Sequence, residues 1–174
     1  RFLKAVTRDG FGDNLFRDWR YDNNQNLIED FNLNKIKNDS KILLAGRNFG
    51  CGSSREHAAW AIYDYGFRVV LSSFFADIFK NNALNNGLLV IQFDQKIINE
   101  IFNKVSNDIY SSFSVDLEEQ RFFSEDGFFD ETFEINEYNK TCLINGFDNI
   151  DYLLNIKDKI LKFEESKPWK KLLF

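Results

Sequence analysis

The chain has 174 residues, of which 44% are hydrophobic and 28% charged, values typical of one packed domain or at most two small ones. Its net charge is −5 and no stretch concentrates lysine and arginine, which argues against nucleic acid as a partner because binding to phosphates needs clustered basic side chains. No apolar run approaches the roughly 18 residues of a membrane-spanning helix, and two cysteines make no disulfide framework, so the cytosol is the expected compartment.

The first 40 residues are rich in Asn, Asp, Gly and aromatic side chains, which predicts loops with short strands. Beyond them, three short apolar runs are typical of buried strands, at 41–46, 67–72 and 88–93. Helices are predicted in the two intervals, over 53–65 and 74–86, with Gly66 and Gly87 directly after them in the position of a C-cap. This alternation predicts right-handed crossovers and a parallel sheet.

The C-terminal half adds a different pattern. The spacing of apolar residues over 94–105 predicts one more helix with a single apolar face. Two runs then alternate in polarity and predict strands, at 113–123 and 131–138, with a turn at Asp126-Gly127 between them. A last helix is expected over 150–167, stopped by Pro168. The fold class predicted from these elements is α/β with an antiparallel addition.

The segment after the first predicted strand, GRNFGCGSSREHAAWA at 46–61, holds the only histidine of the chain and one of its two cysteines. Gly50 and Gly52 allow the backbone to turn sharply and to approach a ligand closely. Ser53 and Glu56 have the spacing of a capping box, which is a purely structural role for both.

A functional interpretation of the same segment rests on the start of the predicted helix. A helix N-terminus offers free N–H groups and partial positive charge, and such a site collects anions. Arg55 adds a planar two-donor group that suits a carboxylate. The prediction is therefore a small carboxylate or phosphate ligand, with the reaction left open.

The same residues suggest other chemistry as well. Cys51 and His57 would make a thiol nucleophile and base, but a lone histidine is more often structural, and we prefer that reading. Cys51 as a metal ligand lacks a second local ligand cluster. The segment is not a nucleophile elbow, because Arg55 stands where glycine is needed after the serine, and it is not a P-loop, because no Gly-Lys-Ser/Thr follows.

Four stretches resemble, in the same order, the small subunits of 3-isopropylmalate dehydratase within the aconitase family: FGDNLFRDWRY (11–21), the segment 46–61, YGFRVVLSSFFADIFKNNALNNGLL (65–89) and LINGFDNI (143–150). The resemblance implies a swivelling β/β/α domain with a mixed, partly parallel sheet flanked by helices. It also implies that residues 1–174 form a single domain of this type, without the N-terminal segment of the family.

The function implied by the resemblance is half of a hydro-lyase of leucine biosynthesis. Such an enzyme isomerises 2-isopropylmalate and 3-isopropylmalate by dehydration and rehydration, and is active only when a large subunit is present. In the family the large subunit holds a [4Fe-4S] cluster whose open iron acts as a Lewis acid, so no metal is expected in this chain. A hetero-oligomer with that subunit in the cytoplasm is expected.

The resemblance also implies roles for individual residues. At the positions of the family motif, Ser53 is the base that removes the proton next to a carboxylate. The substrate carboxylate is held by Ser54 and Arg55, with Gly52 in the same turn, and Arg8 in KAVTRDGFG is a second substrate arginine. Two alternatives stay open: the small subunit of a related dehydratase acting on homoaconitate or a methyl-substituted malate, and a non-catalytic carboxylate- or phosphate-binding module.

Overall fold

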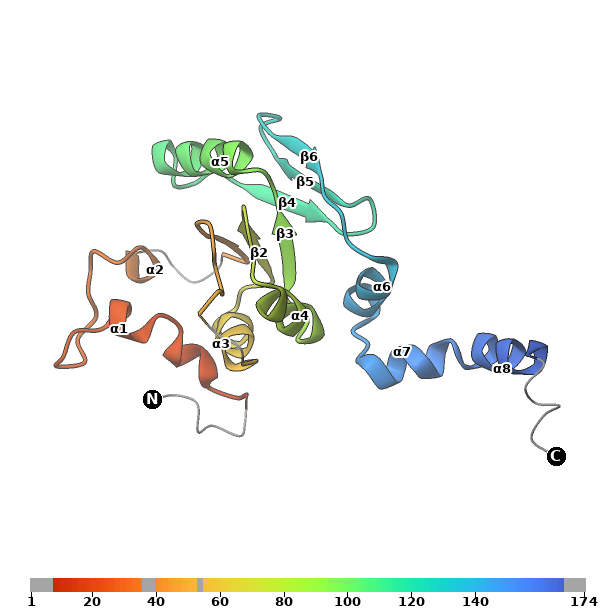
Figure 1. Ribbon diagram of the computed structural model, residues 1–174. Helices are drawn as coiled ribbons and strands as arrows, with labels where there is room; N and C mark the ends of the chain where they lie inside the picture. The colour runs from red at the N-terminus through yellow and green to blue at the C-terminus, as the bar shows by residue number, and fades with distance from the viewer. Residues whose placement is uncertain (1–7, 36–39, 53–54, 168–174) are drawn as a thin grey trace.

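The computed structural model describes residues 8–35, 40–52 and 55–167, and its centre is a parallel sheet (Figure 1). The sheet has the strand order β1 (Ile42–Leu44), β2 (Val69–Ser72), β3 (Leu89–Gln92), with both neighbouring pairs parallel. Helices α3 (His57–Tyr65) and α4 (Asp77–Asn85) lie on one side of it. Helix α5 (Gln95–Asn107) and a second sheet lie on the other.

The second sheet is antiparallel and consists of β4 (Phe113–Asp116), β5 (Arg121–Ser124) and β6 (Asp130–Thr132). The α/β class and the parallel crossovers are therefore confirmed, and the parallel and antiparallel strands form two sheets instead of one mixed sheet. The layers run helices, parallel sheet, antiparallel sheet, which is the β/β/α order.

Two hydrophobic cores fill the spaces between the layers, and β2 contributes to both. Val70 points to the core that contains α3 and α4, whereas Val69 and Leu71 point to the core under α5 and the antiparallel sheet. All four residues of β2 are buried, as expected for a central parallel strand covered on both faces. In α5, Ile98 and Ile101 are buried, but Phe102 of the predicted apolar face is exposed.

Residues 8–35, the described part of the N-terminal region, differ from the prediction of loops with short strands. They form the 3-10 helix η1 (Phe11–Asn14) and the short helices α1 (Arg17–Arg20) and α2 (Asn32–Lys35). Gly12 explains how η1 packs against α3. Its N–H donates to the carboxylate of Asp64 at 2.7 Å, and an added Cβ would lie 2.5 Å from the backbone nitrogen of Tyr65. Only glycine permits this approach.

Three helices follow the antiparallel sheet: α6 (Glu137–Asn145), α7 (Asn149–Asn155) and α8 (Lys157–Ser166). The single helix predicted over 150–167 is thus two helices joined at Ile156, and Pro168 lies outside the described residues. Asp148 and Asp151 form a capping box that starts α7. Within the described ranges, every helix is too short or too polar to span a bilayer.

Candidate functional site

The loop that carries the candidate residues leaves β1 and enters α3. Its beginning is bonded to the end of β2: the N–H of Ala45 donates to the carbonyl of Leu71 at 2.8 Å, and the hydroxyl of Ser72 donates to the carbonyl of Gly46 at 2.8 Å. These are the carboxyl ends of parallel strands, the edge where ligands bind in open α/β sheets.

The turn itself depends on two left-handed residues, Asn48 with φ 65° and Gly50 with φ 78°. An added Cβ on Gly50 would lie 2.3 Å from Cγ of Phe79, so the loop packs directly on α4. A glycine is therefore needed at position 50, as predicted. The group that approaches it closely is the core ring of Phe79, whereas the prediction was a ligand. Gly52 is exposed and has open space around the position of a Cβ, which leaves its backbone accessible to a ligand.

Helix α3 begins at His57, four positions later than the predicted start at residue 53. Glu56 occupies the N-cap position without a side-chain cap hydrogen bond, so it is not the third helical residue that a capping box requires. The predicted capping box is therefore wrong at Glu56, while Ser53 and Ser54 lie outside the described residues. Helix α3 thus begins two residues after Arg55, and the positive end of the helix lies close to this residue in the chain.

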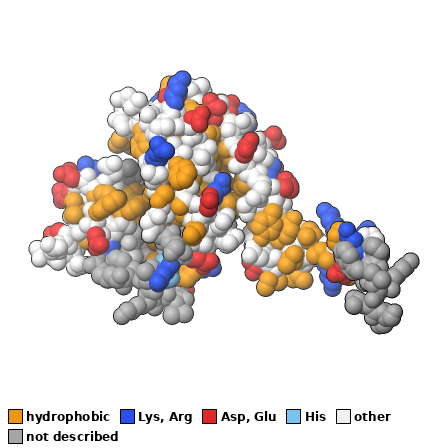
Figure 2. Space-filling view, in the orientation of Figure 1, with side chains coloured by type: hydrophobic (Ala, Val, Ile, Leu, Met, Phe, Trp, Pro, Cys, Tyr) orange, Lys and Arg blue, Asp and Glu red, His pale blue; other side chains and the backbone are white. Residues whose placement is uncertain are grey.

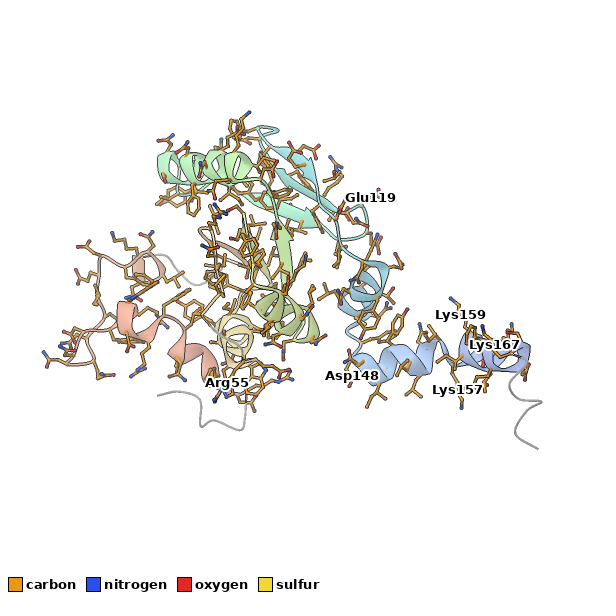
Figure 3. All side chains as sticks on the ribbon, in the orientation of Figure 1. Arg55, Glu119, Asp148, Lys157, Lys159 and Lys167 are labelled. Atoms are coloured by element: carbon orange, nitrogen blue, oxygen red, sulfur yellow. The ribbon has the colours of Figure 1, made fainter. Side chains whose placement is uncertain are left out.

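The structure brings a second arginine to the same end of α3. Figure 3 shows Arg55 at the lower edge of the molecule, next to this helix, and its side chain is exposed. The guanidinium group of Arg8 lies over the ring of Trp60, 5.4 Å from the ring centroid, in the first turn of α3. Two of the predicted substrate residues, far apart in sequence, thus belong to one end of one helix.

Trp60, a residue that sequence reasoning did not single out, contacts Arg8 at this end of α3. Its indole N–H donates to the side-chain oxygen of Asn86 at 2.9 Å, which fixes the ring under Arg8. The Trp60 ring therefore packs against the ring of His57 and also makes a cation–π contact with Arg8. The sequence holds no local signal for this contact, because Arg8, Trp60 and Asn86 come from three separate segments.

Cys51 and His57 occupy different environments. Cys51 is exposed on the turn, and its N–H donates to the carbonyl of Asn48. The imidazole ring of His57 packs against the rings of Phe11 and Trp60, with centroid distances of 5.5 and 4.6 Å. This aromatic packing agrees with the structural role preferred for the histidine.

A hollow of about 390 Å³ lies beside the loop, and its walls are mostly apolar. It is lined by Gly50, Gly52 and Phe49 of the loop, by Phe11 and Phe16 at the two ends of the N-terminal segment 11–16, and by side chains of α3 and α4, among them Ala58 and Phe79. Asn14 and His57 are the polar side chains of its lining, and a mostly apolar wall with a few polar groups is the usual composition of a small-molecule site. Sequence reasoning did not predict it, since its walls come from four separate segments.

The residues present do not fit an iron–sulfur cluster. Such a cluster is held by three or four thiolates, and the sequence has two cysteines, Cys51 and Cys142, placed on the turn and in α6. Nor do the residues with described positions bring three histidine, cysteine or acidic side chains together as a metal site.

Comparison with known proteins gives a consistent result. Residues 1–96 match the family of aconitase C-terminal domains. The 3-isopropylmalate dehydratase small subunit of Christiangramia forsetii is 55% identical over 170 residues, which cover 98% of this chain and 83% of that protein. The protein of the same name from Halalkalibacterium halodurans is 49% identical over 168 residues, 96% of this chain and 86% of that protein.

Among solved structures, the crystal structure of a 3-isopropylmalate dehydratase from Methanocaldococcus jannaschii matches with a TM-score of 0.51. The two chains are 28% identical, and the match covers 76% of this chain and 72% of the other.

Proposed function

Because the chain belongs to the aconitase C-terminal domain family and, within it, to the 3-isopropylmalate dehydratase small subunits, we propose that its β1–α3 loop forms one wall of a dehydratase active site. The enzyme is a hydro-lyase of leucine biosynthesis that interconverts 2-isopropylmalate and 3-isopropylmalate. This chain is its small subunit, and it works with a large subunit.

The main observation in favour of an active-site role for the β1–α3 loop is the pair of arginines, Arg8 and Arg55, near the start of α3. Isopropylmalate carries two carboxylates, and the guanidinium groups of Arg8 and Arg55 offer planar pairs of donors that match them. The N-terminal end of α3 adds positive potential at the same place. Gly52 lets the backbone approach the substrate, and Ser54, by its position in the family motif, donates to the same carboxylate.

Removal of the proton next to the substrate carboxylate is assigned to Ser53, again because of its position in the family motif. A serine is a weak base unless its alkoxide form is stabilised. The positive end of α3 and the positively charged Arg55 nearby both stabilise the negative charge of this alkoxide. Cys51, in the same turn, is assigned no chemical step.

The apolar hollow beside the loop suits the part of the substrate that is neither carboxylate nor hydroxyl. An isopropyl group gains free energy by leaving water, at roughly 25 cal/mol for each Å² of apolar surface buried. Phe49 and Phe16 line this hollow next to Gly52. The hollow therefore favours a branched alkyl side chain over the additional carboxylate of homoaconitate.

The [4Fe-4S] cluster is assigned to the large subunit, where its open iron polarises the leaving hydroxyl when bound. The thiols of this chain are too few for it, and both are free in the structure. A reducing cytoplasm, which preserves free thiols and an iron–sulfur cluster, is the compartment that we assign.

The test is reconstitution with a dehydratase large subunit under anaerobic conditions. We expect interconversion of the two isopropylmalates by the pair and none by either subunit alone, and no cluster bound by this chain alone after reconstitution. A panel with citramalate and homoaconitate separates the related dehydratases. Binding of carboxylates without turnover by the pair would favour the non-catalytic binding module.

A further inference from the structure

The two last helices, α7 and α8, form an arm that projects from the body of the molecule (Figure 1). None of their residues is buried. Several large apolar side chains of the arm are about half exposed or more, namely Ile150, Leu153, Leu154, Leu161 and Phe163. Figure 2 shows hydrophobic side chains gathered over the region of α6 and α7.

The apolar side chains of α7 share one face. Ile150, Leu153 and Leu154 have the spacing i, i+3, i+4, and their exposed fractions are 66, 52 and 64%. Proteins rarely leave such a contiguous apolar patch in water unless another molecule covers it. Anchors at this spacing are typical of a helix that lies in an apolar groove of a partner.

We propose that the arm docks in an apolar groove of the large subunit, an inference that rests on the proposed function. Since this chain has too few thiols for the cluster, the large subunit has to face Arg55 to complete the active site. Figure 3 shows Arg55 and Asp148, the residue that caps α7, on the same lower edge of the molecule. The arm therefore leaves the body from the edge that the partner approaches.

A second copy of this chain is a weaker occupant. Each helix of the arm offers about two to three turns, and the two are interrupted at Ile156, whereas isolated helices shorter than roughly 12–15 residues are marginal in water. A second copy on the arm would also leave the cluster and the remaining wall of the active site unsupplied.

The experiment compares two matched substitutions in α7, each adding one negative charge in its last turn. Leu154→Asp places the charge on the apolar face, and Asn155→Asp places it on the opposite, exposed face. Affinity for the large subunit is measured by titration, separately from turnover. We expect Leu154→Asp to weaken binding by about 10-fold or more and Asn155→Asp to change it by less than about 2-fold.

Turnover gives an independent readout. With Leu154→Asp, activity should fall at low subunit concentration and return when the variant is supplied in excess, with KM for isopropylmalate unchanged, because no substrate residue is altered. The variant alone should melt at the wild-type temperature, since Leu154 is exposed. Ile150→Asp, at the other end of the same face, should behave alike.

Three results would overturn the inference. One is equal affinity of Leu154→Asp, Ile150→Asp and wild type for the large subunit. Another is a lower melting temperature of the isolated variants, which would mean that the arm packs on its own body. The third is loss of self-association by the chain alone with binding to the large subunit intact, which would make a second copy the occupant. Lack of turnover by a wild-type pair that binds normally would instead count against the proposed function.

Discussion

The guanidinium group of Arg8 lies over the indole ring of Trp60, and the indole N–H is in turn bonded to Asn86. An arginine from the N-terminal segment, a tryptophan from α3 and an asparagine at the end of α4 therefore form one chain of contacts. This chain holds Arg8 at the end of α3 that also carries Arg55. The position of Arg8, which we propose as a substrate arginine, then depends on the ring of Trp60.

The first prediction separates the ring of Trp60 from its hydrogen bond. Trp60→Leu and Trp60→Phe both lose the bond to Asn86, but only the leucine variant loses the aromatic face under Arg8. An exposed cation–π contact is worth about 0.5–1 kcal/mol, so Trp60→Leu should raise KM for isopropylmalate roughly 2- to 5-fold above that of Trp60→Phe. Steady-state kinetics of the reconstituted pair measures the difference. Equal KM values in the two variants would remove the supporting role of the ring.

The second prediction concerns the shape of the Arg55 side chain. Arg55→Lys keeps the positive charge but loses the planar pair of donors that a carboxylate accepts from. The kcat/KM of the reconstituted pair should fall by about 10-fold or more. A purely surface role would cost less than about 1 kcal/mol, or about 5-fold. Near-normal kinetics of Arg55→Lys would therefore support a surface role, and Lys41→Arg serves as a control for an exposed basic residue elsewhere.

The third prediction assigns the chemistry of the turn. Ser53→Ala should lower kcat of the pair by about 10²- to 10⁴-fold, as expected when a proton-transfer group is removed. Cys51→Ser should retain most activity, because the exposed Cys51 is given no step. Both variants should assemble with the large subunit, which size-exclusion chromatography checks. The reverse result, an inactive Cys51→Ser with an active Ser53→Ala, would move the chemistry to the thiol.

The fourth prediction concerns the length of the substrate side chain. Phe49 lines the apolar hollow and contacts the rings of Phe16 and Phe79. Phe49→Ala should lower kcat/KM for isopropylmalate more than for methyl-substituted malate, because one methylene in an apolar pocket is worth about 1–3 kcal/mol. The ratio of the two kcat/KM values is the measured quantity. An unchanged ratio would place the alkyl group outside this hollow.

The fifth prediction is a pH dependence of stability. Asp126, in the turn between β5 and β6, accepts hydrogen bonds from the ammonium group of Lys104, the hydroxyl of Ser124 and the N–H of Phe128. The bond from Lys104 is the largest cause that lowers the pKa of the Asp126 carboxyl to about 2. Because the folded pKa lies below the unfolded value of about 3.9, the stabilisation is present above about pH 4. It is lost as the pH falls toward 2.

Substitution of Asp126 tests the predicted direction of this pH dependence. The difference in urea midpoint between wild type and Asp126→Asn should be largest above about pH 4 and should shrink between pH 4 and about pH 2. Glu125→Gln, which removes a neighbouring charge in the same turn, is the control. A difference that grows with falling pH would contradict the assignment of Lys104 and Asp126 as a stabilising pair.

Most of the layered fold could be predicted from short-range patterns. The apolar runs around Val70 and Val90 are strands, and Gly66 and Gly87 follow α3 and α4, because burial and glycine placement are local properties of the sequence. The break at Ile156 could not be predicted, since neither glycine nor proline marks it.

Prediction of the site was less complete, because its geometry depends on long-range contacts. A serine and a glutamate at capping-box spacing predicted a helix from residue 53, but α3 starts at His57. The preceding turn is shaped by the contact of Gly50 with Phe79, which lies in another element. The contact of Arg8 with Trp60 likewise joins segments that no local pattern relates.

The lack of buried residues in α7 and α8 bears on how long the subunit survives in a cell. Helices that bury nothing open at little cost in free energy, so proteases should cut an orphan subunit there before the layered body. A bound partner would shield the same backbone. Surplus small subunit would then be degraded instead of accumulating, and the numbers of the two subunits would be matched by turnover without separate control of their synthesis.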